Sequence, residues 1–352
     1  MEIPFARSLR GLFSPNARMR EDWDLRARRD ARFYIDCGHG GSEDTFWKSG
    51  EEDLSRYVLR SIELARSAAT LEIGCGIGRL LKPLSERVAR ATGVDISGEM
   101  IRRAAEALAG RPNVRLLQTR GDLAGVADGS VDFVYSHIVF QHVPSKEAIG
   151  RYFDEAARVL RSGGILRFQV DGRAEDRLRR PTTWEGAHFR ADEVRSALSA
   201  RGFDVVDQSG EGTQYLWTTS RRRPETGRPS TDAVRAVPRK WDPAALDALL
   251  SRLGPEAEAA RGLLLSGATD LRQLVEPFLA GHTADRPRDY VAAAYRTILG
   301  REPDEGGLAY YAGEIEQGTA RTNVIDCLLS SAEFDERHRR AAESPTSPSH
   351  TS

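Results

Sequence analysis

A glycine-rich turn is the feature of this sequence that points most clearly to chemistry. Gly74, Gly76 and Gly78 alternate with other residues directly after a short apolar run. Glycine permits a sharp bend and lets a ligand approach where a Cβ would otherwise stand, and a helix that begins there offers N–H groups without intrahelical partners. Such a turn is typical of nucleotide-like cofactor sites, including those of dinucleotide-binding proteins.

Two acidic residues accompany this turn. Glu72 lies just before the first glycine, and Asp95 ends the next apolar segment, where a carboxylate can accept hydrogen bonds from both ribose hydroxyls of an adenosine. The spacing is Gly-x-Gly-x-Gly, with Arg79 where a dinucleotide motif has its last glycine, which disfavours a nicotinamide-linked oxidoreductase. The alternative is a packing turn followed by a helix N-cap aspartate.

Short apolar segments alternate with amphipathic ones through the first two-thirds of the chain. The strand-like segments are 71–74, 91–95, 114–117, 131–136 and 165–170, and the helical ones are 79–90, 99–109 and 146–160. This alternation predicts a parallel sheet with helices on both faces. A helix at 192–200 then precedes two β-rich runs, 203–207 and 214–219, whose short connection predicts an antiparallel hairpin at the sheet edge.

The pattern changes near residue 220. Residues 220–239 are rich in Arg, Pro and Ser, which is the composition of a linker, although the arginines at 221–223 could also bind phosphates. Upstream, residues 18–66 are expected to be helical, interrupted by a Gly-rich turn at 37–41. The sequence predicts a helical N-terminal segment or lid (1–50), an α/β domain (51–220), a linker (221–240), an all-α domain (241–340) and a disordered tail (341–352).

Two further motifs extend the pattern beyond the glycine turn. Residues 121–123 read Gly-Asp-Leu shortly before the strand at 131–136, and residues 159–164 read Val-Leu-Arg-Ser-Gly-Gly before the next strand. With these motifs, residues 23–219 resemble the class I S-adenosylmethionine (SAM)-dependent methyltransferase family. The resemblance implies an α/β, Rossmann-like fold with seven strands in the order 3-2-1-4-5-7-6, of which the seventh is antiparallel.

The resemblance also assigns cofactor contacts by matched position. It implies that Glu72 and Gly74 contact the methionine end of SAM, that Asp95 holds the ribose, and that Asp122 accepts the adenine amino group. The other implied cofactor contacts are Cys75, Gly76, Gly78, Ile96, Met100, Leu123 and Ser136.

Histidines after the fourth predicted strand are candidates for the acceptor side. Methyl transfer from a sulfonium is an in-line displacement, in which the protein positions the acceptor and supplies a base where an oxygen or nitrogen must lose a proton. His137 and His142 titrate in the useful range, so each is a candidate catalytic base. Each could instead form pocket wall or pack in the core, and His39 and His188 are further candidates.

The aromatic residues, possible metal ligands and cysteines give weaker indications of function. Tyr34, Phe46 and Trp47 could form a lid over the cofactor, or be core residues of an amphipathic helix. No cluster of His, Cys and acidic side chains has metal-ligand spacing, so no metal is expected. Cys37, Cys75 and Cys327 lie far apart and are expected to be free thiols.

A second resemblance covers the C-terminal region. An amphipathic helix ends at residues 299–304, which read Leu-Gly-Arg-Glu-Pro-Asp, and a later helix carries Ser-Ala-Glu-Phe at 331–334. Residues 287–337 resemble the DUF4214 family, a helical module that accompanies surface, extracellular-matrix and glycan-related proteins. Asp304 and Glu305 could bind a cation, or form a loop with a helix N-cap.

Charge and composition bound the remaining function classes. The 352 residues include 51 basic and 52 acidic side chains, for a net charge of -1, which gives no reason to expect nucleic acid or an anionic membrane as partner. No apolar run is long enough to span a bilayer and no signal peptide is recognised, so a bacterial cytoplasmic location is expected.

Together these features predict a SAM-dependent methyltransferase (EC 2.1.1.-). We expect O- or N-methylation of a small-molecule or glycan acceptor, with the C-terminal helices as a docking module for a protein or glycan. The alternative is a non-enzymatic SAM-binding scaffold that acts through its helical module.

Overall fold

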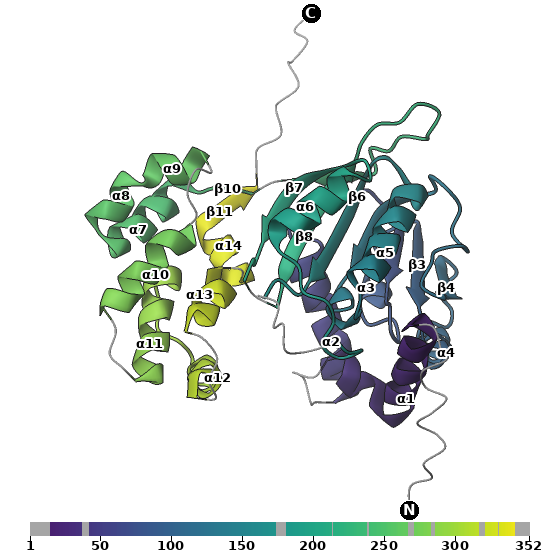
Figure 1. Cartoon of the computed structure of the whole chain (residues 1–352), viewed down its shortest axis with the longest axis horizontal. Coiled ribbons are helices and arrows are strands. Elements are labelled where there is room, and N and C mark those ends of the chain that lie inside the picture. Colours follow the sequence, from purple (N-terminus) through teal and green to yellow (C-terminus); the bar gives the residue numbers. More distant parts are fainter. Residues whose placement is uncertain are drawn as a thin grey trace, which may run out of the picture. The chain divides into compact units, whose positions relative to one another are not determined.

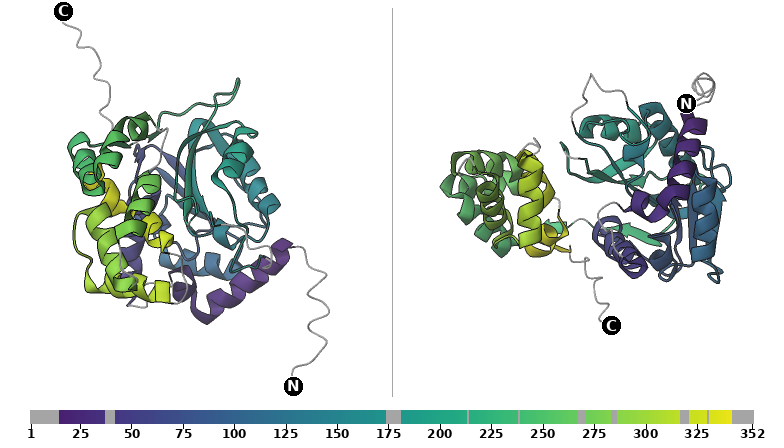
Figure 2. Two further views of the ribbon diagram at one scale, coloured as in Figure 1. Left: turned by 60° about the vertical axis from the view of Figure 1, so that its left-hand side comes forward. Right: turned by 90° about the horizontal axis from the view of Figure 1, so that it is seen from below.

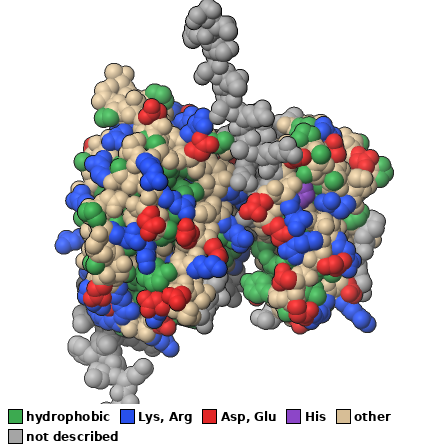
Figure 3. Space-filling view, turned by 180° about the vertical axis from the view of Figure 1, so that it is seen from behind, with side chains coloured by type: hydrophobic (Ala, Val, Ile, Leu, Met, Phe, Trp, Pro, Cys, Tyr) green, Lys and Arg blue, Asp and Glu red, His purple; other side chains and the backbone are tan. Residues whose placement is uncertain are grey.

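The computed structural model describes residues 15–36, 42–173, 181–212, 214–237, 239–266, 271–282, 286–316, 321–329 and 331–341. The chain divides between residues 236 and 237 into two compact units (Figure 1). His39, Cys37 and the tail from residue 342 lie outside the described residues. Basic and acidic side chains are interspersed on the face that Figure 3 shows.

A seven-stranded sheet forms the centre of the first unit, in the order β4-β3-β2-β5-β6-β8-β7. Its strands are β2 (Ala69–Ile73), β3 (Arg90–Asp95), β4 (Val114–Gln118), β5 (Val131–Ser136), β6 (Leu160–Val170), β7 (Phe203–Ser209) and β8 (Leu216–Arg222). Neighbours from β4 to β6 are parallel, whereas β8 is antiparallel to β6 and β7. Numbered from β2 as the first strand, this is the predicted order 3-2-1-4-5-7-6, so the predicted fold is confirmed.

Helices cover both faces of this sheet (Figure 2). They are α3 (Leu81–Ser85), α4 (Gly98–Ala107), α5 (Lys146–Val159) and α6 (Ala191–Ser199). Side chains alternate across β5, with Val134 packing in the cluster that contains α5 and α6 residues, and Phe133 and Tyr135 in the cluster that contains α3. A strand that is buried on both faces has apolar residues on both, which explains why apolar and polar residues alternate only weakly in the sequence of β5.

The N-terminal segment departs from the predicted helical stretch at its end. Helices α1 (Pro15–Ile35) and α2 (Glu43–Asp53) are followed by a π-helical turn, η2 (Leu54–Val58). Residues Ile62–Leu64 then form strand β1, which pairs antiparallel with β9 (Val234–Ala236). The prediction of helix up to residue 66 was therefore wrong, because the partner strand lies about 170 residues away and local periodicity cannot reveal it.

The helix predicted over 79–90 is also shorter than expected. Only Leu81–Ser85 is α-helical, because the chain must turn back into the sheet. The amides of Ala89 and Arg90 both donate to the carbonyl of Ala68 at 3.1 and 3.2 Å, which starts β3 beside β2.

Residues 221–236 belong to the first unit rather than to a linker. Arg228 Nη1 donates to the carbonyls of Arg158 at 2.7 Å and Leu160 at 3.0 Å. Arg222 donates to the carbonyl of Gly202 at 3.0 Å. These arginines therefore satisfy backbone acceptors at the ends of sheet and helix, and the segment closes with β9.

The second unit is a helical bundle around its own core. Its helices are α7 (Pro243–Leu253), α8 (Pro255–Ala259), α9 (Arg261–Ser266), α10 (Leu271–His282), α11 (Pro287–Ala294) with η4 (Tyr295–Leu299), α12 (Glu305–Glu316), α13 (Thr322–Leu329) and α14 (Ala332–His338). A two-stranded pair, β10 (Arg239–Trp241) with β11 (Arg339–Ala341), departs from the all-α prediction. Among the described residues, no helix combines the length and apolar character needed to cross a bilayer.

The loop after η4 shows what Asp304 does. Gly300 adopts a left-handed conformation with φ of 68° at the end of the helix, as glycine does at helix C-termini. Asp304 Oδ1 then accepts from the amide of Gly307 at 2.8 Å, which caps the start of α12. This contact favours the loop with an N-cap over the cation-binding alternative.

Candidate active site

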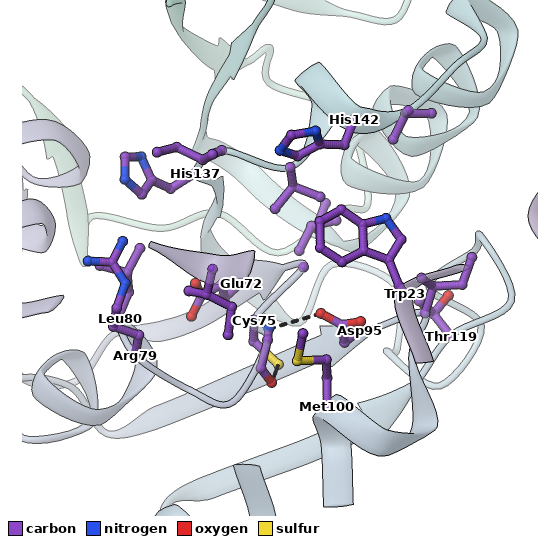
Figure 4. Close-up of a pocket in the computed structure, with 18 of the residues that line it drawn as sticks. Trp23, Glu72, Cys75, Arg79, Leu80, Asp95, Met100, Thr119, His137 and His142 are labelled. Atoms are coloured by element: carbon purple, nitrogen blue, oxygen red, sulfur yellow. Dashed lines mark hydrogen bonds between the residues drawn. The ribbon is translucent and has the colours of Figure 1, made fainter. Parts of the chain in front are cut away.

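A cavity of about 850 Å³, its open mouth included, lies beyond the carboxyl ends of β2, β3 and β5 (Figure 4). The sheet order reverses between β2 and β5, and open α/β sheets bind ligands at such a switch point. The first strand supplies Glu72 to the cavity wall, the second supplies Asp95, and His137 follows the third.

The glycine turn forms the floor of this cavity. Gly74 has φ of 77°, and a Cβ there would overlap the Val139 side chain. Gly76 has φ of 53°, and its Cβ would lie 2.8 Å from Ile35 Cδ1 of α1. Glycine is therefore required at both positions by backbone conformation and by space.

Asp95 is tied to the turn. Its Oδ2 accepts from the amide of Gly76 at 2.9 Å and its Oδ1 from the amide of Ser97 at 2.8 Å. Burial raises the pKa of Asp95 to about 6, although these amide hydrogen bonds favour the ionised form. The N-cap of α4 is Ser97, whose side chain accepts from Met100 N. Asp95 is thus not the N-cap, and its carboxylate faces the cavity.

Glu72 is buried beside it. Its Oε2 accepts from the hydroxyl of Tyr135 at 2.9 Å. Burial raises the pKa of Glu72 to about 8, against the opposing effects of that hydrogen bond and of the Arg79 charge. A cationic group placed in the cavity would favour the ionised carboxylate.

The predicted cofactor residues fall into two groups. Those that line the cavity are Glu72, Gly74, Cys75, Gly76, Asp95, Ile96 and Met100. Gly78, Asp122, Leu123 and Ser136 are not among its lining residues.

Three residues of the second group have a hydrogen-bond partner within the protein. The Leu123 amide donates to Glu155 Oε2 at 2.6 Å, Ser136 Oγ donates to the carbonyl of Ile73 at 3.1 Å, and the Asp122 carbonyl accepts from Thr119 Oγ1. Thr119 lines the cavity where Asp122 was expected. The adenine contacts that the resemblance implied for Asp122 and Leu123 therefore remain predictions.

Helix α1 contributes part of the cavity wall, of which the sequence identified Tyr34 but not the other residues. Met19, Trp23, Tyr34 and Ile35 all line it. Of the three predicted lid aromatics only Tyr34 does so. Phe46 instead packs in a buried cluster with Ala27, Ala31, Ile77 and Met100, and Trp47 packs at the edge of that cluster.

His142 lines the cavity with both ring nitrogens engaged. Its Nδ1 lies 2.6 Å from the carbonyl of Trp184, and its Nε2 lies 3.3 Å from the Gln141 side-chain nitrogen. Burial lowers the pKa of His142 to about 4, so the imidazole is neutral, donates through Nδ1 and accepts through Nε2. His188 pairs with Asp171 at 3.3 Å and is not a lining residue.

His137 lies at the other end of the cavity, on the same side as Arg79 (Figure 4). Arg79 Nη1 donates to Asp53 at 2.8 Å and to Ser49 at 3.1 Å, and it lies 3.4 Å from Asp36. Sequence reasoning missed this charged group, because Asp36 and Asp53 come from the ends of α1 and α2 and no local motif connects them to the strand ends.

Residues 71–168 match a family model described as a methyltransferase domain. The first unit contains a methyltransferase domain. Its strand order is that of the class I fold predicted from the sequence. Residues 281–338 match a family model described as a domain of unknown function, DUF4214, so both resemblances are confirmed.

The methyltransferase region is similar to known proteins over part of its length. The chain is 35% identical over 119 residues to the trans-aconitate 2-methyltransferase of Azoarcus sp. (strain BH72), which is 33% of this chain and 44% of that protein. It is 34% identical over 112 residues to the ubiquinone biosynthesis O-methyltransferase of Xanthomonas oryzae pv. oryzae (strain PXO99A), 31% of this chain and 45% of that protein. The chain thus spans less than half the length of these relatives.

Among solved structures, the chain is similar to a Haemonchus contortus phosphoethanolamine N-methyltransferase 1 in complex with phosphoethanolamine and S-adenosylhomocysteine. The TM-score is 0.47 at 17% identity, with 64% of this chain and 53% of that chain covered.

SAM is the cofactor of this methyltransferase domain, and the residues present fit it. SAM carries positive charge on its sulfonium and its amino group, and the cavity offers two buried carboxyls, Glu72 and Asp95. Ile96 and Met100 offer an apolar surface for the base. Among the described residues, no group of three His, Cys, Asp or Glu side chains is placed to hold a metal ion.

Proposed function

We propose that this protein transfers the methyl group of SAM to a small-molecule acceptor. The observation that carries the proposal is the placement of two buried carboxyls, Glu72 and Asp95, at the carboxyl ends of adjacent strands around a glycine turn. When bound, SAM supplies an electrophilic methyl group on a sulfonium.

The residues that would hold the cofactor have distinct tasks. Asp95 uses one lone pair of each oxygen on backbone amides, which leaves a second lone pair on each for the two ribose hydroxyls. Glu72 would receive the amino group of the methionine end, since it is the other buried carboxyl of the cavity wall and its strand leads directly into the turn. Arg79 lines the cavity with a buried Nε that has no hydrogen-bond partner among the described residues, and it would hold the carboxylate of that end.

A small acceptor is favoured by the enclosure of the site and by the names of the relatives. Helix α1 covers the cavity with Trp23 and Tyr34, so a bulky chain would have to enter past this wall. The similar proteins act, by name, on trans-aconitate and in ubiquinone biosynthesis. A glycan acceptor rests only on the DUF4214 match and is the second choice within this function.

Two measurements test the proposal. Calorimetry should show binding of SAM and of S-adenosylhomocysteine but not of NAD, with Asp95→Asn as the variant that weakens binding. Incubation with methyl-tritiated SAM and a fractionated extract of the source organism should then label the small-molecule fraction. SAM binding with no label in any fraction would refute the enzyme and favour a scaffold that works through the helical unit.

A further inference from the structure

His137 is a buried imidazole whose ring nitrogens the protein leaves without hydrogen-bond partners. Neither Nδ1 nor Nε2 has one among the described residues, and the side chain is 4% exposed. A buried polar group without a hydrogen-bond partner is unfavourable, so such a group on a cavity wall indicates a ligand that completes it.

The ring is held in one plane by two aromatic neighbours. The centroid of Tyr57 lies 5.8 Å from that of His137 with 16° between the planes, and Trp217 lies at 5.5 Å with 19°. These neighbours come from η2 and β8, so two remote elements fix the orientation of one side chain. A base must be oriented to act on one particular atom, and this stacking provides that orientation.

Asp53 places a carboxylate beside the His137 ring. Its Oδ2 lies 3.6 Å from His137 Nε2, longer than a hydrogen bond but within ion-pair range once the imidazole is protonated. Such contacts often tighten when the substrate binds. With Nε2 directed at Asp53, Nδ1 is the nitrogen left for a ligand.

The charges around the pair give each member a defined protonation state. Burial alone would raise the pKa of Asp53, but His137 and Arg79 outweigh it and leave that pKa below its usual value, so Asp53 is ionised. Burial lowers the pKa of His137, against the Asp53 carboxylate, and Arg79 lowers it further while Asp36 opposes. The other groups nearby are the phenol of Tyr57 and Arg167, which lies over Trp217. The imidazole is thus neutral at rest and able to accept a proton.

We propose that His137, with Asp53 behind it, is the base that accepts the proton of a hydroxyl group on the methyl acceptor. The acceptor oxygen forms its bond to the methyl carbon as its O–H bond breaks and the proton passes to His137. The electron pair of the carbon–sulfur bond stays on sulfur, which leaves a thioether, and Asp53 stabilises the imidazolium. This inference rests on the proposed function and deepens it, because it names the acceptor class.

The alternatives are less well placed. His142 has both ring nitrogens engaged by protein groups, so neither is left to accept a proton from an acceptor. A carboxylate acceptor would have no proton to give, and it would bring a negative charge toward Asp53. An alcohol or phenol supplies the donor that the free nitrogen of His137 lacks.

The test compares His137→Gln and Asp53→Asn with the wild type and with His188→Gln, a histidine that does not line the cavity. The probe is the small-molecule fraction of the extract with methyl-tritiated SAM, assayed from pH 5.5 to 9 at saturating SAM. We expect His137→Gln to slow transfer by about 10²–10⁴-fold and to change the dissociation constant of SAM by less than about threefold. His188→Gln should behave like the wild type.

Asp53→Asn provides the readout that a structural role would not produce. Removing the carboxylate lowers the pKa of His137, so the acid limb of the pH–rate profile should move to lower pH, and ¹⁵N NMR titration of His137 should show the same shift. Transfer by His137→Gln at the wild-type rate with an unchanged profile would overturn the inference and leave the proposed function intact. No transfer by the wild type to any fraction would refute the proposed function, and the inference with it.

Discussion

The affinity of the first unit for SAM should depend on pH through Asp95. Only the ionised carboxylate offers charge-assisted hydrogen bonds to both ribose hydroxyls, and its pKa in the free protein is about 6. The ionised fraction falls from about nine-tenths at pH 7 to about one-tenth at pH 5, and apparent affinity scales with the competent fraction. Asp95 should therefore weaken binding about tenfold over this range, or about 1.4 kcal/mol.

Asp95→Asn isolates this contribution from those of other groups. Asparagine keeps one acceptor oxygen but turns an amide N–H₂ toward the N–H of Gly76 or Ser97. Losing two charged hydrogen bonds for one neutral bond costs about 2–3 kcal/mol, or about 30- to 150-fold in the dissociation constant at pH 7. The ratio of the two proteins' dissociation constants should then shrink about tenfold at pH 5, because the variant has no carboxylate there to protonate.

Isothermal titration with SAM at pH 5, 6 and 7 measures this ratio. Asp192→Asn on the exposed start of α6 is the control for a lost carboxylate away from the cavity, since its side chain is 68% exposed. The argument that Asp95 receives the ribose fails if Asp95→Asn binds as tightly as the wild type at pH 7. It also fails if the ratio is the same at pH 5 and pH 7.

Three further outcomes follow from burial and hydrogen bonding. Without cofactor, the free energy of unfolding should fall as pH rises from about 4.5 to about 8, because unfolded Glu72 has lost its proton and folded Glu72 keeps it. Urea titrations should show that Glu72→Gln removes this component, at most about 1.4 kcal/mol per pH unit. Arg228→Ala should destabilise the first unit by about 1–3 kcal/mol, since the partly buried carbonyls of Arg158 and Leu160 each lose a hydrogen bond from the guanidinium; an unchanged urea midpoint would restore the linker interpretation. Phe334→Ala should cost the second unit about 3–5 kcal/mol, whereas the exposed Tyr310→Ala should change its stability by less than about 0.5 kcal/mol, as thermal unfolding can compare.

The strands of the sheet could be predicted from sequence because their signals are local, whereas their order was implied by the resemblance to the methyltransferase family. Apolar segments of strand length, the glycine turn after the first and the glycine pair at 163–164 lie within a few residues of the elements they define. The acid at the end of β3 was recognisable for the same reason, since its distance from the turn follows from one helix and one strand. When such local signals all agree with one fold, that fold can be predicted from the sequence.

The parts that sequence did not reveal depend on distant contacts. Strand β1 is only three residues long and is defined by its pairing with β9. Arg228 looked like part of a solvated linker because its acceptors are backbone carbonyls, which leave no mark in the sequence. The Leu123 amide was expected to contact the cofactor, yet the Glu155 carboxylate, 32 residues later in the chain, accepts its hydrogen bond.

The two histidines after β5 also could not be distinguished as bases from the sequence, because their difference depends on distant contacts. They lie five residues apart on one loop, so spacing alone could not decide between them as bases. The chain between them adopts φ of 55° at Ile138, a conformation that costs energy for a β-branched residue. Its amide donates to the buried Gln169 at 3.0 Å, which in turn donates to the carbonyl of Gln214 at 2.8 Å.

This strained turn sets the different environments of the two rings. His137 comes before it and stacks with Tyr57 and Trp217 near Asp53. His142 follows it and reaches the carbonyl of Trp184 instead. Because a base is defined by its free nitrogen and by the charge behind it, the remote partners decide which histidine can accept a proton. Residue type and spacing identified the pair, and only the packing of α2, η2 and β8 against one of them distinguishes their chemistry.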